Sequence, residues 1–179
     1  MKKIYMFTLI ALLFTGCSTL KVQTDYDTEY NFTNNTTYAV VNNAKEGDNT
    51  LTYDRIQTSI KDNINTKGYK EVANENADLV LVSHVQVTQM SDIRTDYERI
   101  GYGGYSYGGG TIVVPRSVTY RWQEGQLIID AYNPKTKKIV WRGIVKDEIS
   151  NASYTAEENI EYINDVVTKV LKSFPNSGV

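Results

Sequence analysis

The sequence contains one cysteine, one histidine and only three prolines among its 179 residues. A single cysteine cannot form a disulfide within the chain, so the stability of the fold must come from packing. A lone histidine cannot supply the several ligands that a typical zinc site requires. The chain also lacks a basic excess, because 19 basic and 21 acidic side chains give a formal net charge of −2. Binding to nucleic acid is therefore not expected, since such proteins carry basic patches.

What the chain does contain is a strongly patterned beginning. Two lysines precede an apolar run from Ile4 to Phe14, which leads through Gly16 to Cys17. A basic start, a short apolar segment and a small residue before the cleavage point predict a secretory signal peptide at residues 1–16. The apolar run is shorter than the roughly 20 residues of a membrane-spanning helix.

The segment that ends at Cys17 resembles the lipobox of bacterial lipoproteins, although Phe14 stands at the position where leucine is usual. The resemblance implies that Cys17 is acylated and anchors the protein in a membrane, which takes two acyl chains to be stable. Ser18 after the cysteine resembles the sorting signal of Gram-negative outer-membrane lipoproteins. We therefore expect a protein on the inner leaflet of the outer membrane, facing the periplasm, with residues 17–21 as a tether.

Two amphipathic helices are predicted, at about residues 51–67 and 154–174. Thr50 is expected to cap the first helix and Gly68 to end it. Ser153 or Thr155 is expected near the N-cap of the second helix, and Pro175 stops it. The buried stripe of the first helix contains Ile56, Ile60 and Ile64, and that of the second contains Ile160, Ile163, Val167, Val170, Leu171 and Phe174.

The remaining segments predict strands, because apolar and polar residues alternate and turn residues separate them. Their residue ranges are 21–26, 36–42, 69–72, 78–90, 111–122, 126–132 and 138–147. Residues 17–179 number 163 and carry a net charge of −4 (17 basic minus 21 acidic), which is enough chain for one domain. The sequence predicts a single α+β domain at residues 22–175. It would be a two-layer sandwich with a mostly antiparallel sheet of about five to six strands and two main helices.

Four segments of the chain resemble the bacterial lipoprotein family catalogued as domain of unknown function 4136. The segments are VQTDYD at 22–27, RIQTSIKDNINTKGYKEV at 55–72, ADLVLVSHVQV at 77–87 and LIIDAYNPKTKKIVWRGIV at 127–145. The last is the most specific, because it contains the Trp-Arg-Gly that follows a turn in this family. The resemblance implies a periplasmic α+β domain on a lipid anchor, and it implies no activity.

No group of residues identifies a reaction, a metal site or a cofactor. His84 lies in the middle of a predicted strand, with Ser83 on the opposite face, and is expected to be structural. A hydrolase or metal-dependent enzyme that uses His84 with Asp25 or Asp130 is kept as an alternative. Asp25, Asp27 and Glu29 would share one face of an extended segment and could bind calcium, but the calcium-binding EF-hand pattern is absent. Solvated charges on an edge strand, or a pair that fixes Tyr26, are the preferred interpretation.

Residues 101–110 contain six glycines and three tyrosines and predict a flexible loop. The loop lacks the phosphate-binding pattern GxxxxGK[ST]. Tyr102, Tyr105 and Tyr107 are candidate contacts for a partner. In the predicted strand at residues 138–147, Trp141 is expected to pack beneath a helix. Arg142 is expected to lie on the opposite face, beside a carboxylate or in solvent.

The sequence thus favours a lipid-anchored envelope protein with a non-catalytic binding or scaffolding domain. The first alternative is the enzyme that uses His84. The second is a subunit of a secretion or surface-assembly complex that contacts its partner through the tyrosine loop.

Overall fold

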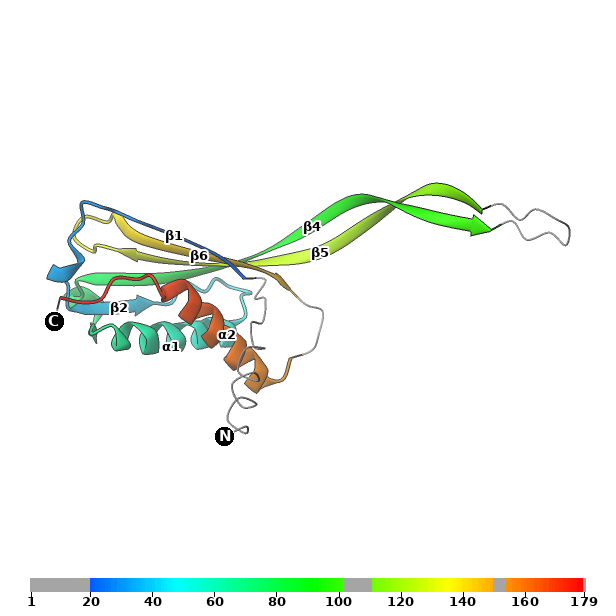
Figure 1. Cartoon of the computed structure of the whole chain (residues 1–179). Helices are drawn as coiled ribbons and strands as arrows, with labels where there is room; N and C mark the ends of the chain where they lie inside the picture. The colour runs from blue at the N-terminus through cyan, green and yellow to red at the C-terminus, as the bar shows by residue number, and fades with distance from the viewer. Residues whose placement is uncertain (1–19, 102–110, 150–153, 179) are drawn as a thin grey trace, which may run out of the picture.

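The computed structural model describes residues 20–101, 111–149 and 154–178. Within them, six strands form one sheet and two α-helices cover one of its faces (Figure 1). The strands are β1 (Lys21–Tyr26), β2 (Thr37–Val41), β3 (Lys70–Glu71), β4 (Leu79–Gly101), β5 (Thr111–Tyr132) and β6 (Ile139–Ile149). The helices are α1 (Thr50–Thr66) and α2 (Ala156–Leu171), and two short 3-10 turns are η2 (Phe32–Asn34) and η3 (Asn74–Asn76).

The strand order across the sheet is β1-β6-β5-β4-β2-β3. β2 runs parallel to β3 and β4, and the other neighbours are antiparallel. The predicted α+β class and the mostly antiparallel sheet with two main helices are therefore confirmed. Among the described residues, no helix is long and apolar enough to cross a membrane.

α1 begins one residue earlier than the sequence predicts. Asn49, not Thr50, is the N-cap, and its side chain accepts a hydrogen bond from the Thr52 backbone N–H at 3.3 Å. At the other end, Gly68 adopts a φ of +88°, the left-handed conformation that commonly follows the last helical residue. The predicted stop at Gly68 is therefore confirmed.

α2 begins with a complete capping box. The Thr155 hydroxyl accepts from the Glu158 backbone N–H at 3.2 Å, and the Glu158 carboxylate accepts from the Thr155 backbone N–H at 2.7 Å. The expectation that Ile160 is buried is wrong, because its side chain is 44% exposed. The N-terminal end of α2 points away from the sheet, so this turn has no strand beneath it (Figure 1). The helix ends at Leu171, before the predicted residue 174.

Trp141 is the largest fully buried side chain, and it lies beneath α2 as predicted. Its ring meets the Phe174 ring edge to face, with centroids 5.0 Å apart. A Cβ on Gly143 would overlap the Trp141 ring and lie 2.6 Å from a methyl group of Val170 on α2. Glycine is required here because the indole covers this position and the helix comes close to the strand. The Trp-Arg-Gly segment therefore fixes the distance between the two layers.

Asp78 joins β2 to β4 at their first residues. Its carboxylate accepts hydrogen bonds from the backbone N–H groups of Thr36 and Thr37, both at 3.1 Å, and from the Thr37 hydroxyl at 2.8 Å. Partial burial acts to raise the pKa of Asp78, but these hydrogen bonds outweigh it and leave the pKa lowered. The charged carboxylate thus holds the parallel pair in register.

The largest departure from the predicted elements is the length of β4 and β5. β4 continues to Gly101 instead of ending near Met90, and β5 is one continuous strand instead of two. The pair leaves the body of the protein as a long twisted hairpin arm (Figure 1). From Met90 opposite Trp122 to Gly101 opposite Thr111, β4 and β5 pair only with each other; we call this part the ribbon.

Pro115 lies in the ribbon opposite Tyr97. Because proline has no N–H, this pair exchanges no ladder hydrogen bonds, and the proline nitrogen faces the free edge of β5. This agrees with the edge position that proline favours in sheets.

Candidate functional site

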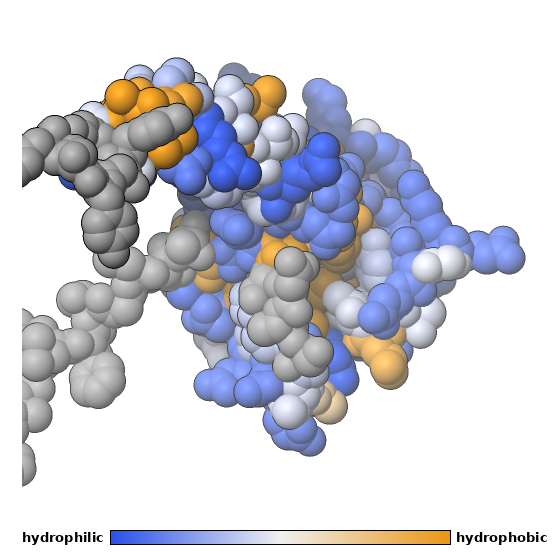
Figure 2. Space-filling view, turned by 90° about the vertical axis from the view of Figure 1, so that its right-hand side faces the viewer, coloured by the Kyte–Doolittle hydropathy of each residue, from blue (hydrophilic) through white to orange (hydrophobic). Residues whose placement is uncertain are grey.

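An apolar pocket of about 590 Å³ lies between the two helices and the sheet, near the point where the ribbon leaves the body. Figure 2 shows this side of the molecule, with apolar side chains in a hollow near the centre of the view and polar side chains around it. The wall includes Ile56, Val85, Leu127, Val145, Ile163 and Val166. These residues come from α1, β4, β5, β6 and α2, so the pocket is the open end of the hydrophobic core.

The pocket exists because the two layers diverge at this end. Deeper in the core, Ile60, Ile129 and Val167 are fully buried. At the pocket, Leu127, Ile163 and Val166 retain 7–9% of their exposure. The apolar side chains on the inner face of the strands and along α2 thus continue beyond the place where the two layers touch, and there they line the pocket.

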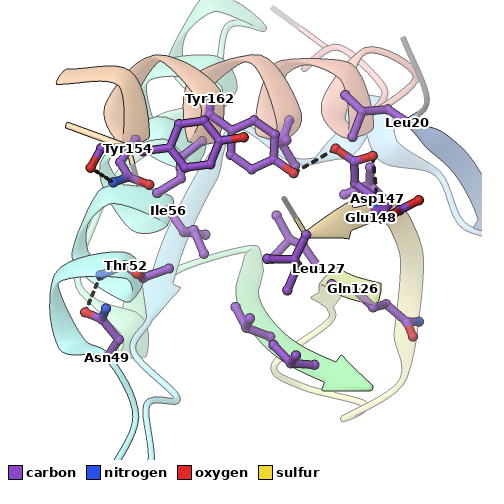
Figure 3. Close-up of a pocket in the computed structure, with 18 residues that line it drawn as sticks. Leu20, Asn49, Thr52, Ile56, Gln126, Leu127, Asp147, Glu148, Tyr154 and Tyr162 are labelled. Carbon is purple, nitrogen blue, oxygen red and sulfur yellow. Dashed lines mark hydrogen bonds between the residues drawn. The ribbon is translucent and has the colours of Figure 1, made fainter. Parts of the chain in front are cut away.

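Polar groups surround the mouth of the pocket (Figure 3). The Tyr162 hydroxyl donates a hydrogen bond to the Asp147 carboxylate at 3.0 Å. The Tyr154 ring stacks on that of Tyr162, with centroids 6.3 Å apart and an interplanar angle of 14°. Burial raises the pKa of Tyr162, and the hydrogen bond and negative charge of Asp147 raise it further. Tyr162 is therefore a neutral donor to Asp147. Leu20, the first described residue, also lies at this pocket.

A second cluster lies on the face of the sheet away from the helices. Arg142 binds the buried Asp130 carboxylate through two hydrogen bonds, at 2.6 Å from Nε and 2.8 Å from Nη2. Of the two predicted positions of Arg142, beside a carboxylate or in solvent, the structure shows the carboxylate pairing. The side-chain hydrogen bond and the charge of Asp130 raise the pKa of Arg142 despite its partial burial. His84 lies beside the pair, with its Nε2 atom 3.9 Å from the Asp130 carboxylate.

The structure thus brings His84 next to Asp130, as the enzyme alternative requires. The shallow depression around His84 is lined by no serine, threonine or cysteine among the described residues. Ser83 is fully buried on the opposite face. Asp25 lies on β1, three strands from β4, and its carboxylate accepts the Tyr26 backbone N–H. The described residues at this place form a bidentate ion pair with a neighbouring histidine, and they do not form a serine or cysteine triad.

The three acidic residues near the N-terminus do not form a ligand set. β1 ends at Tyr26, so Asp25 is in the strand, whereas Asp27 and Glu29 lie in the turn that follows. The Asp27 carboxylate accepts the Glu29 backbone N–H at 3.0 Å and closes that turn. Across the described ranges, no group of three or more acidic, histidine or cysteine side chains could hold a metal ion.

Several predicted residues lie outside the described ranges. These are Cys17 and the three tyrosines of the loop, Tyr102, Tyr105 and Tyr107. In contrast, sequence reasoning missed both the pocket and the ribbon. The pocket has no local signal, because its wall is assembled from distant segments. The ribbon did have one: apolar Ile93 and Tyr97 alternate with charged residues over 92–98, which is a strand pattern.

The chain belongs to a family that is described as Domain of unknown function (DUF4136), which matches residues 22–176. No curated protein sequence matches the chain.

Several solved structures resemble this chain at low sequence identity. A PDZ domain protein from Parabacteroides distasonis has 15% identity and a TM-score of 0.50; the match covers 89% of this chain and 37% of that protein. A PelC dodecamer from Paraburkholderia phytofirmans has 12% identity and a TM-score of 0.50, with 88% and 99% covered. A DUF4136 family protein from Bacteroides thetaiotaomicron has 18% identity and a TM-score of 0.44, with 85% and 96% covered. This chain thus spans about a third of the length of the PDZ domain protein.

Proposed function

We propose that this protein is held in the cell envelope by acyl chains on Cys17 and that its domain binds an apolar ligand without catalysing a reaction. The proposed location is the inner leaflet of the outer membrane, facing the periplasm. The signal-like residues 1–16, the following cysteine and Ser18 support it. The binding part of the proposal depends on one observation, the apolar pocket.

The pocket has the properties of a small-molecule site. Its volume of about 590 Å³ is within the usual range of ligand pockets, about 300–1,000 Å³. Half of the residues in its wall are aliphatic, and polar groups converge at the mouth. Such a site suits a hydrocarbon chain with a polar end. A hydrocarbon gains about 0.8 kcal/mol for each methylene group that it buries.

A photoreactive alkyl probe tests this proposal on the lipidated protein in lipid nanodiscs. We expect cross-links in peptides that contain Val85, Leu127 or Val166, identified by mass spectrometry. Val166→Trp fills the pocket with an indole and is expected to remove these cross-links. Leu51 is 63% exposed on α1 and does not line the pocket, so Leu51→Trp is the matched control and should leave them unchanged.

Because Val166→Trp places a large group near the core, its fold is checked by circular dichroism. Val87 lies at the pocket but is 56% exposed, so Val87→Trp offers a second block that the fold tolerates. Labelling of all variants to the same extent, or labelling away from the pocket in the wild type, would contradict the proposed binding function.

A second candidate function is that of a subunit in a secretion or surface-assembly complex, and the ribbon favours it. An isolated two-stranded hairpin is marginally stable in water, and exposed apolar patches mark interaction sites. Ile93 and Tyr97 are 71% and 70% exposed in this ribbon. The PelC protein, whose fold is similar, is a dodecamer in its crystal structure, so the fold is compatible with assembly.

The two faces of the ribbon allow a matched test of this second candidate. Val113 is 55% exposed opposite Arg99, and Ile112 is 54% exposed opposite Ile100, on the other face. If a partner binds the face of Val113, Val113→Asp should lower co-purification from native membranes at least tenfold, whereas Ile112→Asp should not. Equal recovery of the same partners with both variants and the wild type would argue against a ribbon interface.

A further inference from the structure

β4 has a long free edge in the ribbon, which projects from the body of the protein (Figure 1). β2 pairs with β4 only at Leu79–Val82, and beyond Val82 no described strand other than β5 pairs with it. The residues of β4 are exposed from Gln86 to Gly101, apart from the half-buried Asp92. A free edge presents a row of backbone N–H and C=O groups that can pair with another strand.

The position of Pro115 shows which backbone groups point to this edge. The pair of Tyr97 and Pro115 exchanges no ladder hydrogen bonds, and in an antiparallel ladder such pairs alternate with bonded pairs. Every second residue of β4 from Val87 to Arg99, in phase with Tyr97, therefore points its N–H and C=O groups to the free edge. On β5, Pro115 interrupts the corresponding row of N–H groups, whereas β4 contains no proline. The β4 edge is thus the one that can accept a strand along its whole length.

The side chains along this edge are complementary to themselves in the antiparallel direction. If Ile93 lies opposite Ile93 of a second copy, Asp92 lies opposite Arg94 of that copy, and Arg94 opposite its Asp92. A shift by two residues would bring two Asp92 or two Arg94 side chains opposite each other, which is destabilising. A parallel pair in register would place every charge beside its own copy. The charge pattern therefore favours this antiparallel register over its neighbours.

The ribbon of one chain leaves apolar side chains in water. Ile93 and Tyr97 are 71% and 70% exposed, and Asp92 pairs with Arg94 of its own strand at 2.9 Å. Sheets of three or more strands are stable where a single two-stranded hairpin is marginal. A second ribbon along β4 would supply the missing strands, bring the two Ile93 side chains together and give each Asp92 a second arginine.

We infer that two copies of this protein pair antiparallel through the β4 edges of their ribbons, with a two-fold axis at Ile93. The shared sheet has the strand order β5-β4-β4-β5, and the two bodies lie at its opposite ends. This inference goes beyond the proposed function, because it involves neither the pocket nor its ligand.

A disulfide across the two-fold axis tests this arrangement with the full-length protein in native membranes. Ile93→Cys places a thiol opposite the same thiol of the second copy, at a Cα–Cα distance of about 5.5 Å that a disulfide can span. We expect oxidation to give a dimer on a non-reducing gel, with the peptide around position 93 joined to itself in mass spectrometry. Thr119 lies opposite Ile93 on β5, so Thr119→Cys is the matched control and should give no dimer linked at position 119.

Two proline substitutions in the Ile93→Cys protein test which edge pairs. Thr95 and Ser117 lie opposite each other, and each has its N–H on the free edge of its own strand. Thr95→Pro is expected to lower the yield of linked dimer about tenfold or more, because it removes a donor and places a ring in the interface. Ser117→Pro makes the same change on the β5 edge and should leave the yield unchanged. Circular dichroism checks the fold of both variants.

Charge reversal in the same protein tests the register. Arg94→Asp places like charges at both charged pairs and is expected to lower the dimer yield about tenfold. Adding Asp92→Arg exchanges the two charges and should restore the yield. Equal linking at positions 93 and 119, no linked dimer at either position, or an equal effect of the two prolines would overturn the inference. Labelling of the pocket by the alkyl probe does not depend on these outcomes, so the proposed function is judged separately.

Discussion

Replacing Trp141 with alanine is expected to lower the free energy of unfolding by about 3–5 kcal/mol, the cost of removing a large aromatic side chain from a packed core. The side chain is 1% exposed, and it meets Phe174 and covers Gly143 beneath α2. Its loss leaves a cavity between α2 and the sheet. The helix cannot move to fill this cavity and also keep its other contacts with β6. Domains of this size have free energies of unfolding of about 5–15 kcal/mol, so the variant would lose a large part of its stability.

The chain offers a matched control, because it contains one other tryptophan. Trp122 lies on β5 at the base of the ribbon and is only partly buried. Trp122→Ala should cost about 1 kcal/mol, the typical effect of a substitution outside the core. Urea denaturation followed by circular dichroism measures both variants without depending on tryptophan fluorescence. Equal losses of stability would show that Trp141 does not hold the two layers together.

Replacing Cys17 with alanine is expected to abolish incorporation of a clickable fatty acid into the protein. The sulfur of Cys17 is the proposed attachment site, and the chain has no second cysteine. The intact mass of the wild type should correspond to a chain that begins at Cys17 and carries acyl groups. Without them we expect the protein to leave the membrane fraction, because its slightly negative net charge would not hold it on an anionic leaflet.

The neighbouring residue provides the controls for this prediction. Ser18→Ala should retain the fatty-acid label. Ser18→Asp should also retain it but move the protein from the outer-membrane to the inner-membrane fraction, as the sorting rule for such lipoproteins implies. A wild-type protein that begins at Met1 and has no added lipid mass would contradict the proposed anchor.

The sequence predicted those parts of the fold that local chemistry determines. The left-handed Gly68, the Thr155 cap and the apolar stripes on both helices follow from residues close together in the chain. The exposure of Ile160 could not be predicted in this way, because it depends on whether a strand lies beneath the first turn of α2. Periodicity shows which residues share a face but not where the neighbouring layer ends.

The continuity of β5 and the pocket depended on distant contacts. Gln123 to Gly125 read as a break between two strands, yet Gln123 is paired with both Gln89 and Ile149. Gly125 fits because Ile149 packs against it; a Cβ there would lie 3.1 Å from that side chain. Likewise, Tyr162 and Asp147 meet only because α2 returns across β6. A pattern within one segment cannot report such pairs.

The position of β1 has a consequence for biogenesis. Lys21 pairs with Lys146, so the first strand of the domain docks on a strand that is synthesised about 125 residues later. Contacts between such distant residues form slowly, because a long loop must close first. If the chain is exported as proposed, β1 has no strand to pair with until nearly the whole domain has emerged. An acyl-transfer enzyme would find the segment around residue 17 next to an undocked strand, so lipid attachment can precede completion of the sheet.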